Sequence, residues 1–248
     1  MSGLHLIMPM GGRGARFFRD GYVMPKPLIR LRDKPFFYWA AQSVLRDVEV
    51  AELRFVVLKE HVEDFAIDRE IRALYPEAEI TVIPEVLPGA VLTSMAGAEA
   101  VRDGAPLLFN DCDHMFRSRA FADFCAAGDF SAPDGALLTF RSSEEKFSYL
   151  RYDERGAIVG TAEKQVVSSD AICGAYYFRD ARTFLSAAEQ YLTECRYEEF
   201  FVSGVYDVMA REGRSIRSFP TDVHISFGTP AEYEAALRDP RLTEVDRA

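Results

Sequence analysis

The sequence predicts an α/β fold with a mixed, mostly parallel central sheet between two layers of helices. In the first half, apolar runs of strand length alternate with segments whose apolar residues recur at helical spacing. After about residue 130 the runs become shorter, and a tight turn joins two of them, which indicates antiparallel strands. A chain of 248 residues can bury a sizeable core and does not require two domains.

The first half is predicted to contain four buried strands and three helices. We expect the strands at Leu4–Met10, Leu53–Leu58, Ile80–Pro84 and Pro106–Asn110. We expect the helices at Phe36–Leu45, Val62–Leu74 and Val91–Val101. This alternation is typical of right-handed β–α–β units, in which helices cover both faces of a parallel sheet. In such a sheet the ligand site lies beyond the carboxyl ends of the strands.

The second half is predicted to contain six shorter strands and three helices. We expect the strands at Ala136–Phe140, Tyr149–Tyr152, Ile158–Glu163, Ala171–Phe178, Ser215–Phe219 and Val223–Phe227. We expect helices at Ala181–Leu192 and Glu198–Arg211, and a last helix that begins after Thr229 as N-cap with Pro230 in its first turn. Asp153–Gly156 is predicted to be a hairpin turn, and the tail Thr243–Ala248 is expected to be loose.

Charge and composition exclude several classes of function. The formal net charge of −10 disfavours nucleic acid as a partner, because phosphate backbones bind to basic surfaces. No run approaches the roughly 20 apolar residues of a membrane span, and the N-terminus does not resemble a signal peptide, so we expect a cytoplasmic protein without membrane binding. The cysteines show neither CxxC spacing nor histidine partners, which argues against a zinc site or a disulfide framework. They are Cys112, Cys125, Cys173 and Cys195.

A glycine-rich basic loop follows the first strand, with the sequence Gly11-Gly12-Arg13-Gly14-Ala15-Arg16. Its three glycines allow backbone N–H groups to turn toward one anion without Cβ clashes, and its two arginines supply planar donors for phosphate oxygens. The loop lacks the Gly-Lys-Ser/Thr of a P-loop, and the third glycine of a dinucleotide-binding motif would fall at Phe17. Alone, the loop predicts only an anion site.

Two further features carry charge suited to phosphate chemistry. Lys26 lies between Pro25 and Pro27, which disfavour a helix, so we expect it in a stiff extended segment. Asp111 and Asp113 follow a predicted strand, and residues two apart in an extended chain point to one face. Both carboxylates can therefore approach one cation. Mg²⁺ suits such a pair, because it needs only one or two carboxylates besides phosphate oxygens and waters.

Together the motifs resemble a known family. Gly-x-Gly-x-Arg at 12–16, followed by Pro-Lys-Pro-Leu at 25–28, is similar to the signature of the nucleotidyltransferases that make nucleotide sugars from sugar 1-phosphates. The preceding Met-Pro-Met at 8–10 resembles the bacterial capsule and surface-polysaccharide branch, and the similarity extends along nearly the whole chain. The resemblance implies a Rossmann-like three-layer nucleotidyltransferase fold. It also implies a Mg²⁺-dependent reaction of a nucleoside triphosphate with a phosphate monoester, giving an NDP-linked product and pyrophosphate.

The resemblance assigns roles to residues of the first half. It implies that Arg16 and Lys26 stabilise charge at the α-phosphate, and that Asp113 binds the metal with Asp111 in support. It implies nucleotide binding by Met10, Gly11, Gly12, Arg13, Gly14, Glu85 and Gly89. We expect one domain over residues 1–248, in which residues 1–130 bind the nucleotide and residues 131–248 bind the acceptor.

The acceptor side is assigned in the same way. The resemblance implies acceptor binding by Glu163 and Lys164, because a carboxylate accepts hydrogen bonds from hydroxyls and a lysine holds a phosphate. It implies that Gly174 leaves room for a sugar ring. The expected donor is CTP, UTP or dTTP, and the expected acceptor is a sugar phosphate or a phospho-alcohol such as phosphocholine. A homo-oligomer is compatible with the resemblance.

One position departs from the family pattern. Ser226 stands where the family usually supplies its second metal-binding aspartate, and a hydroxyl binds Mg²⁺ far less strongly than a carboxylate. Either the metal relies on Asp113 with phosphates and waters, or Asp111 or Asp222 compensates, or activity is lost. Two other functions therefore stay open. One is a GT-A-type glycosyltransferase that uses an NDP-sugar, for which Asp-x-Asp is the expected metal motif, and the other is a non-catalytic nucleotide-sensing homologue.

Overall fold

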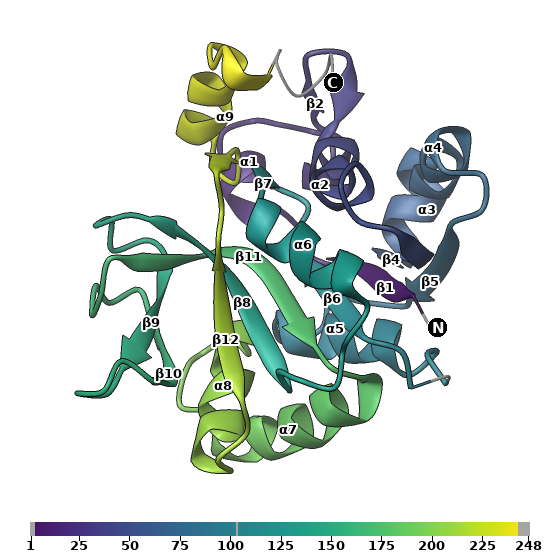
Figure 1. Cartoon of the computed structure of the whole chain (residues 1–248). Coiled ribbons are helices and arrows are strands. Elements are labelled where there is room, and N and C mark those ends of the chain that lie inside the picture. Colours follow the sequence, from purple (N-terminus) through teal and green to yellow (C-terminus); the bar gives the residue numbers. More distant parts are fainter. Residues whose placement is uncertain (1–2, 103, 243–248) are drawn as a thin grey trace.

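The computed structural model describes residues 3–102 and 104–242, and the tail Thr243–Ala248 lies outside these ranges. Within them, nine strands join one mixed sheet that has helices against both faces, and two further strand pairs form short ribbons (Figure 1). The predicted α/β class with a central sheet between two helical layers is confirmed.

The parallel half of the sheet is built around the first strand. β1 pairs in parallel with β4 on one side and with β6 on the other, and β5 pairs in parallel with β4. Their bounds are β1 (Leu4–Met10), β4 (Val50–Leu58), β5 (Glu79–Ile83) and β6 (Leu107–Asn110). The side chains of β1 are buried on both faces, as the continuous apolar run predicts, because consecutive residues of a strand point to opposite faces.

Helices cover both faces of this sheet and form two apolar clusters. One cluster joins alternate β1 residues to α2 (Phe36–Leu45), α3 (Lys59–Phe65), α4 (Ile67–Leu74) and α6 (Arg119–Ala127). The other joins Ile7 of β1 to α5 (Ala90–Ala98), α7 (Ala181–Glu194) and α8 (Val202–Arg211). The sheet therefore lies between two helical layers, and its loops at the carboxyl edge stay free to form a site.

The second half of the chain adds antiparallel strands to the sheet. β11 pairs antiparallel with β6, β8 and β9, and β10 pairs with β9 through a hairpin whose turn lies at the predicted Asp153–Gly156. β12 runs parallel to β8. The bounds are β8 (Gly135–Arg141), β9 (Ser148–Tyr152), β10 (Ile158–Glu163), β11 (Asp170–Phe178) and β12 (Ile216–Pro220).

Short elements surround the carboxyl edge of the sheet. The ribbons pair β7 with β13 and β2 with β3, and α9 begins after Thr229, whose side chain accepts a hydrogen bond from the Glu232 N–H as the N-cap prediction requires. The bounds are α1 (Ala15–Arg19), the 3-10 helix η1 (Lys26–Leu28), β2 (Arg30–Leu31), β3 (Lys34–Pro35), β7 (His114–Arg117), β13 (Val223–Ser226) and α9 (Pro230–Leu237).

The structure corrects three of the predicted elements. Lys26 is not extended but opens η1, because a proline is tolerated in the first turn of a helix, where its missing N–H would lack a partner anyway. The single helix expected at Val62–Leu74 is two helices, separated by Ala66 in a left-handed conformation with φ of 52°. The helix expected from Glu198 begins at Val202.

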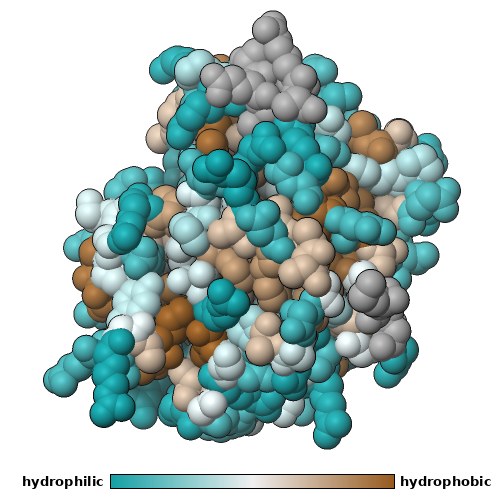
Figure 2. Space-filling view, viewed as in Figure 1, coloured by the Kyte–Doolittle hydropathy of each residue, from teal (hydrophilic) through white to brown (hydrophobic). Residues whose placement is uncertain are grey.

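Figure 2 shows hydrophilic residues over most of one face, with apolar residues in separate groups between them. In residues 3–102 and 104–242 each helix is too short or too polar to cross a membrane.

Candidate active site

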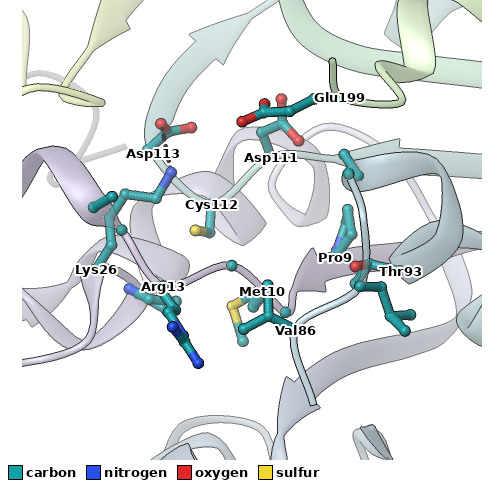
Figure 3. Close-up of a pocket in the computed structure, with 18 of the residues that line it drawn as sticks. Pro9, Met10, Arg13, Lys26, Val86, Thr93, Asp111, Cys112, Asp113 and Glu199 are labelled. Carbon is teal, nitrogen blue, oxygen red and sulfur yellow. Dashed lines mark hydrogen bonds and ion pairs between the residues drawn. The ribbon is translucent and has the colours of Figure 1, made fainter. Parts of the chain in front are cut away.

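A cavity of about 490 Å³ lies beyond the carboxyl ends of β1 and β6, where the parallel sheet predicts a site. Its walls come from the glycine-rich loop, from the segment after β5 and from the turn after β6 (Figure 3). Its lining includes Met10–Ala15, Lys26, Val86–Ala90, Thr93, Asp111–Asp113 and Glu199. We call it the first cavity. A volume of this size falls in the usual range of ligand sites.

A second cavity of about 200 Å³ adjoins it. It is lined mostly by the second half of the chain, including Lys146, Glu163, Gly174 and Ser226. Asp111 and Asp113 line both cavities. The two carboxylates therefore lie where a ligand in one cavity would meet a ligand in the other.

The three glycines of the loop differ in how much room their surroundings leave for a side chain. A Cβ on Gly11 would lie 2.6 Å from the end of the Ile83 side chain, and a Cβ on Gly14 would lie 2.7 Å from the Lys26 Cβ, so a side chain at either position would displace a neighbour. Gly14 also has a φ of 63°, which favours glycine. A Cβ on Gly12 would meet nothing within 4 Å. Packing therefore does not require glycine at 12, and Gly12 lines the first cavity.

We expect Gly12→Ala to weaken nucleotide binding by about tenfold, or about 1.4 kcal/mol, while the unfolding midpoint stays unchanged. The added methyl group would occupy space on the ligand side of the loop but would touch no protein atom. Equilibrium dialysis with a labelled nucleoside triphosphate and thermal unfolding measure the two quantities. Gly14→Ala is the matched control, and it should lower the unfolding midpoint because of its φ and its contact with Lys26. Unchanged nucleotide affinity in Gly12→Ala would exclude backbone contact at this glycine.

The Lys26 ammonium forms an ion pair with Asp113, with 2.9 Å between Nζ and Oδ2 (Figure 3). Burial is the largest single influence and lowers the pKa of Lys26, but the charges of the surrounding acidic groups, with Asp113 first, and the hydrogen bond to Asp113 together raise the pKa well above its ordinary value. Burial is the largest single influence and raises the pKa of Asp113, but the Lys26 charge together with hydrogen bonds and the other nearby groups lowers the pKa below its ordinary value. Both groups are therefore charged at neutral pH, and a cation already lies against one carboxylate.

Asp111 is in a different electrostatic environment. Burial, followed by the charge of Asp113, raises the pKa of Asp111 to about 7. The nearest cation, Lys26, pairs with Asp113 instead. Placing a second cation beside Asp111 would offset this cost, because opposite charge favours the ionised carboxylate.

Two glycines leave room for these carboxylates. A Cβ on Gly174 would lie 2.8 Å from Asp111 Oδ2, and a Cβ on Gly228 would lie 2.4 Å from Asp113 Oδ2. The backbone adds one bond on each side: the Asp111 N–H donates to the Gly174 carbonyl, and the Phe227 N–H donates to the Asp113 carbonyl, both at 2.9 Å. Gly174 therefore has a structural reason to be glycine besides room for a sugar ring.

The donor set fits a magnesium ion better than a zinc ion. In the part of the chain that the structure describes, no three histidine, cysteine or acidic side chains gather as metal ligands. Mg²⁺ requires fewer protein ligands, and Asp111 and Asp113 supply carboxylate oxygens at one place. Ser226 lines the second cavity with them. Asp222 lines neither cavity and pairs with Arg119 at 3.0 Å, so it is not placed to replace the missing aspartate.

The residues predicted for the acceptor separate in the structure. Glu163 lines the second cavity, where its Oε2 accepts hydrogen bonds from the hydroxyls of Ser148 and Ser203. Lys164 lines neither cavity, and its Nζ lies 5.3 Å from the centre of the Phe201 ring. Arg16 lines the second cavity and not the first.

Glu85 and Gly89, the nucleotide-binding candidates after β5, also separate. Glu85 is exposed and lines neither cavity, whereas the four residues after it line the first. Gly89 is among them, but a Cβ there would lie 2.4 Å from the Phe200 backbone nitrogen. Packing against Phe200 therefore explains this glycine without a ligand.

Several residues of the site carry no motif that the sequence could reveal. Lys146 and Glu232 form an ion pair at 2.8 Å and line the second cavity, and Glu199 lines the first beside Asp111 (Figure 3). His114 and His224 also line the second cavity, and burial lowers the pKa of His114 to about 4 and that of His224 to about 3. Both imidazoles are therefore neutral at physiological pH. These residues come from separate elements, so no local spacing indicates them.

Neither a family model nor a curated protein matches the chain. Solved structures do match it. A nucleoside-diphosphate-sugar pyrophosphorylase from Vibrio cholerae is 21% identical, with a TM-score of 0.80, over 94% of this chain and 100% of that chain. A glucose-1-phosphate thymidylyltransferase from Bacillus anthracis, described as putative, is 17% identical, with a TM-score of 0.74, over 95% and 94%.

An inositol-1-phosphate CTP transferase from T. maritima is 14% identical, with a TM-score of 0.75, over 99% of this chain and 96% of that chain. At such identities the matches establish the fold. The chain has the three-layer α/β fold of these structures over nearly its whole length.

Proposed function

We propose that the protein is a nucleotidyltransferase that joins a nucleoside triphosphate to a phosphate monoester and releases pyrophosphate. One observation carries the proposal: the two cavities meet at Asp111 and Asp113, with Lys26 against the pair. The first cavity has the bare backbone of a glycine-rich loop, which suits a triphosphate. The second has carboxylate, hydroxyl and imidazole groups, which suit a hydroxyl-bearing acceptor.

This arrangement suits a reaction that needs no general base. The second pKa of a phosphate monoester is about 6, so the acceptor is already a dianionic nucleophile at pH 7. The lowered pKa values of His114 and His224 make both imidazoles weak proton acceptors, which is consistent with a reaction that needs no general base. The acceptor oxygen attacks the α-phosphorus, and the bond to the leaving pyrophosphate breaks.

The residues of the site then align the reactants and neutralise charge. Lys26 would stabilise the charge on the α-phosphoryl group and the leaving pyrophosphate, and Arg16 would act from the acceptor side. Asp113 and Asp111 would hold Mg²⁺, which when bound supplies charge neutralisation at the phosphates.

The sequence resemblance suggests substrates more specific than those that the fold alone indicates. We propose CTP, UTP or dTTP as donor and a sugar phosphate or phospho-alcohol as acceptor, with residues 1–130 and 131–248 as the two binding halves. The similar structures are described as acting with nucleoside diphosphate sugars, glucose 1-phosphate and inositol 1-phosphate, which supports a polyol phosphate. We also propose a role in capsule or surface-polysaccharide synthesis, which the resemblance of the 8–10 segment supports, and a cytoplasmic location.

A pyrophosphate-release screen tests the proposal. Five nucleoside triphosphates are each combined with sugar 1-phosphates and phospho-alcohols, with Mg²⁺ or with EDTA. We expect release that requires one triphosphate, one acceptor class and Mg²⁺. Transfer from an NDP-sugar without pyrophosphate release would identify the glycosyltransferase instead. Nucleotide binding without turnover on any acceptor would identify the sensing homologue.

We expect Ser226→Asp to lower the Mg²⁺ concentration for half-maximal activity by about tenfold, because a carboxylate binds Mg²⁺ much more strongly than a hydroxyl. Position 226 lines the second cavity with Asp111 and Asp113. Activity is measured against Mg²⁺ concentration at saturating substrates. Ser226→Asn has the same size without the charge and is the control. If both variants respond to Mg²⁺ like the wild type, Ser226 lies outside the metal's reach.

A further inference from the structure

The turn that bears the two carboxylates is closed by a buried side-chain hydrogen bond between its ends. Asn110, the last residue of β6, and His114, the first of β7, flank Asp111–Asp113. The His114 Nε2 and the Asn110 Oδ1 lie 3.0 Å apart. The side chains of both residues are buried, with 0% and 3% exposure.

The hydrogen bonds of Asn110 define the tautomer of this histidine. The Asn110 Nδ2 donates to the Ala40 carbonyl at 2.9 Å, so its Oδ1 faces His114 and accepts. The His114 Nε2 must therefore carry the proton and donate. This gives a directed chain from His114 through Asn110 to the backbone of α2.

That chain connects the carboxylate turn to the element that positions Lys26. Ala40 belongs to α2, which packs in one apolar cluster with Leu28 of η1. Lys26 is the first residue of η1 and pairs with Asp113. Besides the backbone bonds to Gly174 and Phe227, the position of the turn relative to Lys26 thus depends on α2 and on the Asn110–His114 pair.

Packing alone does not require polar groups here. Burying an amide and an imidazole costs free energy unless both are hydrogen-bonded, and two apolar side chains would fill the same space. Asparagine is also depleted in strands. What a hydrogen-bonded pair adds is direction, because its geometry is restricted where apolar packing is not.

We infer that Asn110 and His114 are positioning residues, which hold the turn so that Asp111 and Asp113 present their carboxylates to the metal and to Lys26. The inference rests on the proposed function. Neither residue is proposed to contact the reacting atoms. A displacement of the turn by about 1 Å is enough to cost on the order of a hundredfold in rate.

The test uses Asn110→Leu and His114→Phe, which keep size but lose the hydrogen bond. We expect both to raise the dissociation constant for Mn²⁺, measured by electron paramagnetic resonance on the full-length protein, by about tenfold. We expect kcat to fall about 10²-fold with little change in KM for the triphosphate. His114→Gln retains a donor for Asn110 and should recover part of both quantities.

Ser43→Ala is the matched control. The Ser43 hydroxyl is buried, accepts from the Phe116 N–H and donates to the Trp39 carbonyl, both at 3.0 Å, so it also ties α2 to β7 but does not close the turn. This variant should lose stability without losing Mn²⁺ affinity. If Asn110→Leu and His114→Phe lose stability but keep the wild-type Mn²⁺ affinity, as Ser43→Ala should, the inference is wrong. If Asn110→Leu does not fold, a wild-type Mn²⁺ affinity in His114→Phe overturns it.

The Mn²⁺ titration also separates this inference from the proposed function. A wild-type protein that releases no pyrophosphate would contradict the proposed reaction. In that case the Mn²⁺ affinities of the variants would still decide whether the pair positions the carboxylates.

Discussion

Lys26→Ala is expected to lower kcat by about 10²–10³, the usual loss when one preorganised donor is removed from a site of charge development. Its ammonium lies 2.9 Å from Asp113 at the junction of the two cavities. Nucleotide affinity should change much less, because the glycine-rich loop keeps its backbone donors. Single-turnover kinetics and nucleotide binding measure the two effects separately.

The stability of Lys26→Ala provides an independent readout. The variant leaves two carboxylates, Asp111 and Asp113, close together without their nearest cation, so its unfolding midpoint should fall in the absence of metal. Mg²⁺ should restore part of the loss, because a ligand that binds only the folded state stabilises it. Lys34→Ala is the control, since Lys34 lies over the Tyr38 ring and lines neither cavity. A near wild-type kcat in Lys26→Ala would refute its assigned role.

The second large effect is a contrast between the two aspartates. Asp111→Asn and Asp113→Asn should each lower activity by about 10²-fold or more, because each removes a negative charge from the proposed metal site. Their effects on stability should have opposite signs. Asp111→Asn removes a buried charge that repels Asp113, so the unfolding midpoint should rise by about 2–4 °C.

Asp113→Asn should instead destabilise the protein. It removes the partner of Lys26, and an ion pair that loses one member leaves the other charge uncompensated. Both side chains keep about a quarter of their exposure. We therefore expect the free energy of unfolding to fall by about 1–3 kcal/mol, less than for a fully buried pair. Thermal unfolding without metal measures both variants. Equal shifts of the same sign would contradict the assigned charges.

Much of the fold follows from local patterns. The predicted bounds of β1, α2 and β10 agree with the structure. β1 and α2 are mainly apolar runs bounded by a glycine-rich turn or a proline, and β10 follows the turn at Asp153–Gly156. The element missed at His114–Arg117 is short and pairs with Val223–Ser226, more than a hundred residues away. No local signal predicts such a strand, since its partner stabilises it.

The candidate site shows the same division. The glycine-rich loop and the aspartate pair stand out in the sequence because the motif itself contains the chemistry. Lys146 and Glu232 do not, because they are ordinary charged residues until the fold brings them together at 2.8 Å. For Lys164 and Glu85 the opposite holds: their motifs predict a role in the site, but neither residue lines either cavity.

The sequence by itself determined the α/β class, the order of most elements and a phosphate-type chemistry, because apolar period, turn residues and clustered charge are local properties. Only the tertiary structure decided which charges meet. It placed Lys26 against Asp113, gave Asp111 no ion-pair partner among residues 3–102 and 104–242, and put Arg16 and Ser226 at the second cavity. Electrostatic interactions depend on distance and burial through space, and sequence separation specifies neither.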